Sequence, residues 1–477
     1  MAPNILWLVT DQQMCANRPA VTRQLPLQRF LAHRGTRFNK AYTALPICSP
    51  ARATMLTGRY PHNHGLTEND GRFGGRAGLD PGDRMIQHAF SKAGYRCGHF
   101  GKWHLNNDLP ATDFAFEGYG PPGYGYPYGS ARYSEYLEKH GLPNPTCRIE
   151  LSGESNTPPG TIIDLAEQVD WFDFEAGSAI LTSPAETHEA FFVADMAIDW
   201  LEQVDDAPFF LRVDTWGPHP PYTVATPFDT MFADLPTMAS SNIDFDLRGR
   251  PQHHRDYLNY WQSKLGRENR NAAMLSRRAL QQAAMCETAL LRVVMHLASA
   301  GQLDNTLVVY CADHGDAVAS NGGMLNKGGL MVEETLRIPL IFAGPGVQKN
   351  ISSDTLVMNA DISPTLTSAA ELPDFPNDGQ DLFFLLSRNE PLSRTGIMTQ
   401  HNGLHVPLCQ RSWHQGDWKY MIQADGFEEL YDLRNDPTER QNLATDVSHK
   451  DQLQSLRCAL SEEMRRTNDP SITLTQG

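Results

Sequence analysis

The fold is decided by the stretch Asn4-Ile5-Leu6-Trp7-Leu8-Val9-Thr10-Asp11, a short apolar run closed by a carboxylate. Three later runs repeat this pattern: 209–214, 306–313 and 340–344. Continuous apolar runs of this length are typical of central parallel strands that are covered on both faces of a sheet. Helical patterns lie between the runs, over 190–204 and 277–303. Strands that alternate with helices predict an α/β protein.

Two carboxylates, Asp11 and Asp313, come at the carboxyl ends of predicted strands. Open α/β sheets place their functional sites at these ends. An aspartate in this position can also simply cap the next helix. For each residue taken alone, both interpretations stay open.

The pattern of predicted elements changes after residue 390. The segments 397–401, 418–422 and 428–432 look like antiparallel strands, and a helical pattern follows over 449–466. We therefore expect a catalytic domain over residues 1–388 and a smaller C-terminal α+β subdomain over residues 389–477, built on an antiparallel sheet.

Two other segments stand out by composition. The stretch 118–129 is rich in glycine, proline and tyrosine. It is either a surface loop or a wall of the pocket, where tyrosine rings would offer stacking faces. The polar stretch around 234–270 is interpreted as an insertion.

Composition limits the possible functions. The 477 residues are 40% hydrophobic and 20% charged, with a formal net charge of -16, which describes an ordinary globular protein. No basic stretch is long enough to follow a nucleic-acid backbone, so a nucleic-acid partner is not expected. No apolar run approaches the ~20 residues that span a bilayer, and no signal peptide is visible. We therefore expect a cytoplasmic protein without a membrane partner.

The most specific signal surrounds Cys48. The chain reads Cys48-Ser49-Pro50-Ala51-Arg52 and, a few residues later, Thr57-Gly58-Arg59. This resembles the signature of the type I sulfatases, formylglycine-dependent members of the alkaline-phosphatase-like superfamily. In that signature a cysteine followed by proline at +2 and arginine at +4 is oxidised to formylglycine. The additional match at Thr57-Gly58-Arg59 argues against a coincidental resemblance.

Further elements of the same resemblance follow in order along the chain. They are Pro3-Asn4-Ile5-Leu6 with Asp11, Gly101-Lys102-Trp103-His104, Gly217-Pro218-His219-Pro220-Pro221, Asp313-His314-Gly315, Asn326-Lys327-Gly328 and the C-terminal Glu429-Leu430-Tyr431-Asp432-Leu433. The resemblance implies an alkaline-phosphatase-like central, mostly parallel sheet flanked by helices. It also implies an enzyme that hydrolyses small sulfate monoesters to an alcohol and inorganic sulfate.

The resemblance assigns a metal site as well. Its ligands would be Asp11, Gln12, Asp313 and His314, with residue 48 facing the ion. A hard, oxygen-rich set favours Ca²⁺, with Mg²⁺ and Mn²⁺ as alternatives, over a structural zinc. A formylglycine-generating maturation enzyme would be a partner, and a homo-oligomer is left open.

The family mechanism implies roles for the remaining residues. Arg52, Lys102 and Lys327 would neutralise the sulfuryl oxygens as charge shifts in the transition state. His219 with Lys327 would assist the leaving alcohol. His104 would take a proton from the second hydroxyl of the formylglycine hydrate and so release sulfate. Asn69 and His401 are further candidates for contacts to the leaving group, with a structural role as the alternative for each.

Competing interpretations remain. The pairs Asp11-Gln12 and Asp313-His314 look like those of the choline-sulfatase and phosphonate-monoester-hydrolase branches. Hydrolysis of phosphonate monoesters or phosphodiesters at the same site is therefore the alternative function, although Lys102 favours sulfate. A non-catalytic binding protein does not explain why so many reactive residues are kept. A cysteine-nucleophile enzyme gives no role to the two aspartates.

Overall fold

The computed structural model describes residues 2–15, 19–152, 157–167, 177–204, 207–233, 240–265, 270–404 and 406–475. Part of the polar stretch predicted around 234–270 lies outside these residues. The part that is described contains a helix, α8 (Gln252–Leu265).

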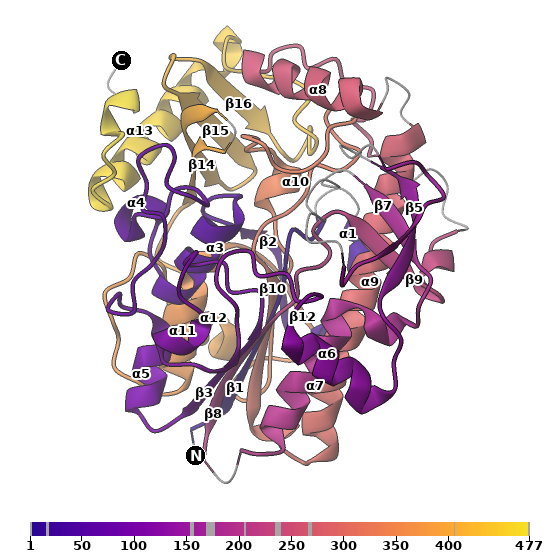
Figure 1. Ribbon diagram of the computed structural model, residues 1–477. Coiled ribbons are helices and arrows are strands. Elements are labelled where there is room, and N and C mark those ends of the chain that lie inside the picture. Colours follow the sequence, from indigo (N-terminus) through magenta and orange to yellow (C-terminus); the bar gives the residue numbers. More distant parts are fainter. Residues whose placement is uncertain are drawn as a thin grey trace.

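An eight-stranded mixed sheet forms the centre of the molecule (Figure 1). Its strands lie in the order β12 (Ile351–Met358), β2 (Gly35–Tyr42), β11 (Leu340–Ala343), β10 (Thr306–Ala312), β1 (Asn4–Thr10), β8 (Phe209–Asp214), β3 (Arg96–Gly101) and β4 (Glu117–Tyr119). Strands β10, β1, β8, β3 and β4 are parallel, and so is the pair β12 and β2.

All four apolar runs predicted as strands are strands of this sheet. The prediction of a parallel strand at 340–344 is wrong in direction, because β11 runs antiparallel to both β10 and β2. A continuous apolar run reports that both faces of a strand are buried, and it carries no information about which way the strand runs.

Both faces of the sheet are covered by helices (Figure 1). Side chains alternate along β1, so Leu6 and Leu8 pack on one face and Ile5, Trp7 and Val9 on the other. The first face is covered by α2 (Pro26–Arg34), α7 (Glu189–Leu201) and α9 (Arg270–Ser299). The second is covered by α3 (Cys48–Thr57), α5 (Ile86–Lys92), α11 (Ile362–Ala369) and α12 (Phe383–Arg388). The two long predicted helices are thus α7 and α9.

A separate antiparallel sheet lies in the C-terminal part of the chain. Its order is β13 (Ile397–Gly403), β14 (Pro407–Gln415), β15 (Trp418–Gln423) and β16 (Glu428–Asp432), and α13 (Lys450–Arg466) follows. Strand β14 was not predicted because its buried positions include polar residues such as Gln410 and Arg411, which hide the alternation. The backbone N–H of Gln400 donates to the carbonyl of Ala44 at 2.8 Å and so joins β13 to the segment that precedes Cys48.

A third sheet was also not predicted. It has the order β6 (Ile162–Asp164), β5 (Thr146–Leu151), β7 (Ser178–Leu181) and β9 (Tyr222–Ala225). These strands are short, and their sequences do not give enough residues for a clear period of two. Among the described residues, no helix combines the length and the apolar character needed to cross a bilayer.

Several buried histidines make stability depend on pH. Burial lowers the pKa of His64, His99 and His188 to about 3, whereas an unfolded histidine has a pKa of about 6.5. Between these values the unfolded chain binds more protons than the folded protein. The stabilising contribution of each neutral imidazole is therefore complete above about pH 6.5 and is lost as the pH falls towards 3.

We expect the free energy of unfolding to drop between about pH 7.5 and about pH 5, by roughly 1.4 kcal/mol per pH unit for each such histidine below its unfolded pKa. Urea unfolding at the two pH values measures this drop in the free energy of unfolding. His99→Leu is the control variant, because both ring nitrogens of His99 are buried and make no hydrogen bond to the described part of the chain. The free energy of unfolding of this variant should fall less steeply with decreasing pH than that of the wild type. An unchanged dependence on pH would contradict the explanation.

Candidate active site

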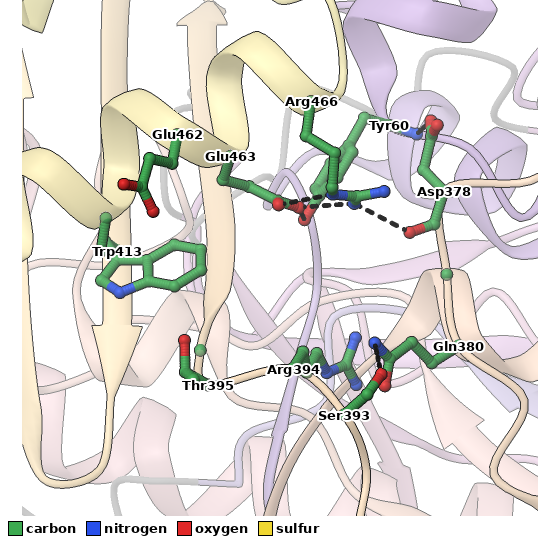
Figure 2. A pocket seen from close by; sticks show the side chains of 13 residues that line it. Tyr60, Asp378, Gln380, Ser393, Arg394, Thr395, Trp413, Glu462, Glu463 and Arg466 are labelled. Carbon is green, nitrogen blue, oxygen red and sulfur yellow. Dashed lines mark hydrogen bonds and ion pairs between the residues drawn. The ribbon is translucent and has the colours of Figure 1, made fainter.

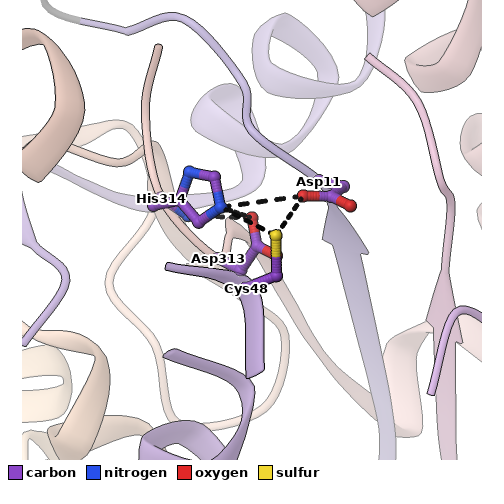
Figure 3. A group of neighbouring side chains, drawn as sticks. All are labelled: Asp11, Cys48, Asp313 and His314. Carbon is purple, nitrogen blue, oxygen red and sulfur yellow. Dashed lines mark hydrogen bonds and ion pairs between the residues drawn. The ribbon is translucent and has the colours of Figure 1, made fainter. Parts of the chain in front are cut away.

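Two carboxylates meet at the carboxyl edge of the central sheet. Strands β1 and β10 are parallel neighbours, with Thr10 opposite Ala312, so Asp11 and Asp313 follow them side by side. Together with Cys48 and His314 they form a buried group whose potential ligand atoms all lie within 4.8 Å of one another (Figure 3). Two carboxylates and an imidazole suit a hard divalent cation, so these residues fit the metal that the sequence analysis expects.

Cys48 is the first residue of α3 and points at this group. Its Sγ lies 3.3 Å from His314 Nε2 and 3.7 Å from Asp11 Oδ1. Burial, and next the charge of Asp11, raise the pKa of the Cys48 thiol. An unmodified thiol is therefore poorly suited to act as a thiolate nucleophile here. Gly58, with φ +66°, ends α3 in the left-handed conformation that favours glycine.

Arg52 lies one turn further along α3 and is fully buried. Its Nε lies 3.0 Å from Asp313 Oδ2 and its Nη1 lies 2.7 Å from Asp214 Oδ2. Burial would lower the pKa of Arg52, but Asp313 and Asp214 outweigh it and raise the pKa. Asp214 was missed by the sequence analysis, although it ends a predicted strand just as Asp11 and Asp313 do.

Lys102 follows β3 and lies against Asp11. Its Nζ donates to Asp11 Oδ2, and both side chains are completely buried. Burial alone would raise the pKa of Asp11, but the charges of Lys102 and Arg52 outweigh this and hold the pKa well below its ordinary value. Asp11 is therefore ionised and available to a cation at neutral pH.

Gln12 connects the carboxylates to Lys327. Its backbone N–H donates to Asp313 Oδ1 at 2.9 Å, and its Nε2 donates to Asp316 Oδ2 at 3.0 Å. Its Oε1 is thereby turned towards the site, where it accepts from Lys327 Nζ. The backbone of Gln12 has φ +56°, which non-glycine residues rarely adopt, so the surrounding structure holds this side chain in a fixed direction.

His219 pairs with Lys327, and the contacts fix its tautomer. Nδ1 lies 2.6 Å from the carbonyl of Pro220, so it carries the proton and donates. Nε2 lies 3.0 Å from Lys327 Nζ and therefore accepts from the ammonium group. Burial, reinforced by the charge of Lys327, lowers the pKa of His219 well below its ordinary value.

His104 is a second imidazole near the site, and it is buried. Its Nδ1 is buried and makes no hydrogen bond to the described residues. Burial, and next the charge of Lys102, lower the pKa of His104 well below its ordinary value. With φ +53°, its backbone is strained in the same sense as that of Gln12. His104 is therefore neutral near pH 7 and can accept a proton.

The two residues expected to contact the leaving group have local hydrogen bonds. Asn69 Oδ1 accepts from the backbone N–H of Ser49 at 3.0 Å, which supports the start of α3. His401 is fully buried in β13, and its Nδ1 accepts from the N–H of Gly403 at 3.0 Å. These contacts give both side chains a structural role, and they do not test a contact with the substrate.

A second buried group consists of His188, Glu189 and Cys286. Glu189 Oε1 accepts from the backbone N–H of Gly217 at 2.8 Å, at the start of the turn that carries His219. Burial raises the pKa of Glu189 to about 8, so this acid is largely protonated at neutral pH. It anchors the turn and lacks the charge that would attract a cation.

A cavity of about 470 Å³ lies elsewhere, beside α13 (Figure 2). Tyr60, Trp413 and Arg466 are among the described residues that line it, and no member of the metal-ligand group is. Its charged side chains are largely paired, as in the 2.7 Å contacts between Arg466 and Glu463. The reactive residues therefore point to the sheet edge and not to this cavity.

Comparisons with known proteins identify the family to which the chain belongs. The chain matches the C-terminal domain of N-sulphoglucosamine sulphohydrolase over residues 323–467. An uncharacterized sulfatase, YidJ of Escherichia coli (strain K12), is 28% identical over 496 residues, which cover 98% of this chain and 88% of the relative. The choline-sulfatase of Rhizobium meliloti (strain 1021) is 26% identical over 472 residues, which cover 93% of this chain and 82% of the relative.

Solved structures share the fold. The phosphonate monoester hydrolase of Agrobacterium radiobacter gives a TM-score of 0.77 at 22% identity and covers 98% of this chain and 96% of that one. A protein solved with its substrate D-glucosamine-2-N,6-O-disulfate gives a TM-score of 0.72 at 19% identity and covers 98% of this chain and 99% of that one. The predicted alkaline-phosphatase-like α/β fold is thus confirmed. The sulfatase family itself matches over residues 3–372, and this chain therefore belongs to that family of sulfuric ester hydrolases.

Proposed function

We propose that this protein hydrolyses small sulfate monoesters and that residue 48, oxidised from cysteine to formylglycine, supplies the nucleophile. The observation that carries the proposal is the direction of the Cys48 side chain, which points at Asp11 and His314 from the first residue of α3. Its Sγ marks the position that the oxygens of the hydrated aldehyde would take. A hydrate offers one hydroxyl to attack sulfur and a second hydroxyl from which the bound sulfate can later be expelled.

Asp11, Asp313 and His314 would hold the divalent metal, with Gln12 as a further ligand through Oε1. When bound, the ion would supply positive charge to the sulfuryl oxygens and to the attacking oxygen. Calcium is the ion we expect, because the set is rich in hard oxygen donors. Arg52 is engaged by Asp313 and Asp214 through Nε and Nη1, so we assign it to holding the carboxylates.

The leaving alcohol would receive its proton from the pair formed by Lys327 and His219. Lys327 donates to Nε2 of neutral His219, so one proton lies between the two side chains. The lowered pKa of His219 makes its protonated form a strong acid. Lys102, at 0% exposure beside Asp11, would place an ammonium on the sulfuryl group.

His104 would act in the second step. Its neutral imidazole can take the proton of the remaining hydroxyl. The C–O bond to sulfate then breaks, the aldehyde is regenerated, and water hydrates it again. A serine at position 48 would have no second hydroxyl and would stop after the first step.

Phosphonate monoesters are the second candidate substrate. The pairs Asp11-Gln12 and Asp313-His314 support it, as does the structural likeness to a phosphonate monoester hydrolase. Both groups are tetrahedral anions, so one set of cations can bind either. We favour sulfate because Lys102 adds a further positive charge to the site.

The test compares kcat/KM on an aryl sulfate, an aryl phosphonate and an aryl phosphodiester with the same leaving group, using protein co-expressed with a maturation enzyme. Mass spectrometry of the peptide that contains residue 48 is run on the same sample. We expect the aldehyde at position 48 and the highest kcat/KM on the sulfate. A faster phosphonate reaction would establish the second candidate, and full activity with only unmodified thiol would refute the nucleophile.

A further inference from the structure

Tyr124 contacts three of the four side chains to which we assign work on the ester, namely Lys102, His104 and His219. Lys102 Nζ lies 3.9 Å from the centre of its ring. The ring centre of His104 is 5.3 Å away at an interplanar angle of 78°, and that of His219 is 5.7 Å away at 70°. The two imidazoles act in different steps of the proposed reaction, and this one ring packs edge-to-face against both.

The loop that carries Tyr124 is tied to both histidine segments. The backbone N–H of Gly123 donates to the carbonyl of Asn106 at 2.8 Å, two residues after His104. Trp216 Nε1 donates to the carbonyl of Tyr124 at 2.6 Å, three residues before His219. The backbone at residues 123 and 124 therefore bridges two segments that are far apart in the sequence.

The tyrosines of this loop pack mainly on protein groups. Tyr126 stacks on Tyr124, with ring centres 6.2 Å apart and planes at 25°. Tyr126 in turn packs edge-to-face on Tyr128 at 4.9 Å and on Trp216 at 6.0 Å. The loop is thus a wall of the site, as one sequence interpretation proposed. The faces of Tyr124, however, are used by Lys102 and Tyr126 and are not free to stack on a substrate.

The contact between the ring and Lys102 has a chemical advantage. An ammonium group has three N–H donors, and one of those of Lys102 goes to Asp11. The face of an aromatic ring attracts the positive charge through its quadrupole and takes up no acceptor atom. Tyr124 can therefore fix the ammonium while donors remain for a sulfuryl oxygen.

We propose that Tyr124 is a positioning residue of this active site, whose ring holds the Lys102 ammonium and both imidazoles in one arrangement. The inference rests on the proposed roles of Lys102, His104 and His219. The ring and not the hydroxyl carries the role, because the contacts with these side chains are made by the aromatic face and edges.

Three variants test this. Tyr124→Leu removes the ring and should lower kcat by about 10²-fold, a loss that a misplacement of catalytic groups by about 1 Å can cause. Tyr124→Phe keeps the ring and should stay within a few-fold of the wild type. Tyr126→Leu, the matched control from the same loop, removes a ring for which the structure shows packing on Tyr124 and not on the three catalytic side chains, and its loss should be much smaller.

The second readout is binding of inorganic sulfate, measured by calorimetry, with thermal unfolding as the folding control. The dissociation constant should rise about tenfold or more in Tyr124→Leu and return close to the wild-type value in Tyr124→Phe. The inference is overturned if Tyr124→Leu keeps wild-type kcat and sulfate affinity. It is also overturned if Tyr124→Phe is as impaired as Tyr124→Leu, or if Tyr126→Leu matches Tyr124→Leu.

Rates are measured on whichever ester the wild type hydrolyses fastest, and inorganic phosphate replaces sulfate as the binding probe if that ester is a phosphonate. A preference for phosphonate would therefore refute the proposed substrate and leave the comparison among the three variants intact. The two proposals fail separately.

Discussion

Asp313→Asn is expected to lower kcat/KM by roughly 10³-fold, which corresponds to about 4 kcal/mol of lost transition-state stabilisation. The variant removes one of the two carboxylate charges of the proposed metal site. It also leaves Arg52 with Asp214 as its nearest ion partner. Metal content after dialysis, measured by mass spectrometry, should fall together with the rate.

Asp214→Asn is the matched control. Asp214 also binds Arg52, at 2.7 Å, but it does not belong to the ligand group. Its substitution should cost less activity and should leave the metal in place. Undiminished activity of the wild type after exhaustive chelation would rule out the metal site. Equal metal loss in the two variants would show that the loss comes from disturbing Arg52 and not from removing a metal ligand.

His104→Ala should fail in a different way. If His104 releases sulfate from residue 48, the variant should still complete the first step and then stop. Stopped-flow measurement with an aryl sulfate should show a burst of about one alcohol per active site. The steady-state rate that follows should be about 10²- to 10⁴-fold below the wild type, and the peptide with residue 48 should carry an added sulfate.

His219→Ala provides the contrast. It should show no burst, and its rate should fall most on esters of poorly acidic alcohols, which need a proton to depart. The absence of both burst and adduct in His104→Ala, with the aldehyde confirmed, would remove its assigned role. Equal losses on aryl and alkyl esters would do the same for His219.

The position of the metal-ligand group could be predicted because it depends on local patterns. The runs before Asp11 and Asp313 are apolar throughout, so both had to be central strands, and the ends of parallel neighbours meet at one edge. The motif around Cys48 singled out this cysteine, but the helix α3 that begins with it was not predicted. The structure brings Cys48 to that edge, although its chemical state and the roles of its neighbours remain predictions.

Other parts of the site depend on contacts that a sequence pattern does not encode. Asp214 ends its strand like the other two aspartates, but only the position of Arg52 reveals its use. Tyr124 lies in a loop whose path is set by hydrogen bonds to Asn106 and Trp216, far away in the sequence. The antiparallel direction of β11 likewise depends on how the chain connects β10 to β11, and the apolar content of a strand does not report that connection.

All ten residues of α3 are buried, and Cys48 is only 2% exposed. Under the proposed function, a maturation enzyme would need access to Cys48, Pro50 and Arg52, and in the folded protein these side chains are buried. Folding and oxidation would then be competing events in the life of each newly made chain. Molecules that fold first would keep their thiol, so the active fraction of a preparation would depend on the relative rates of folding and oxidation during synthesis.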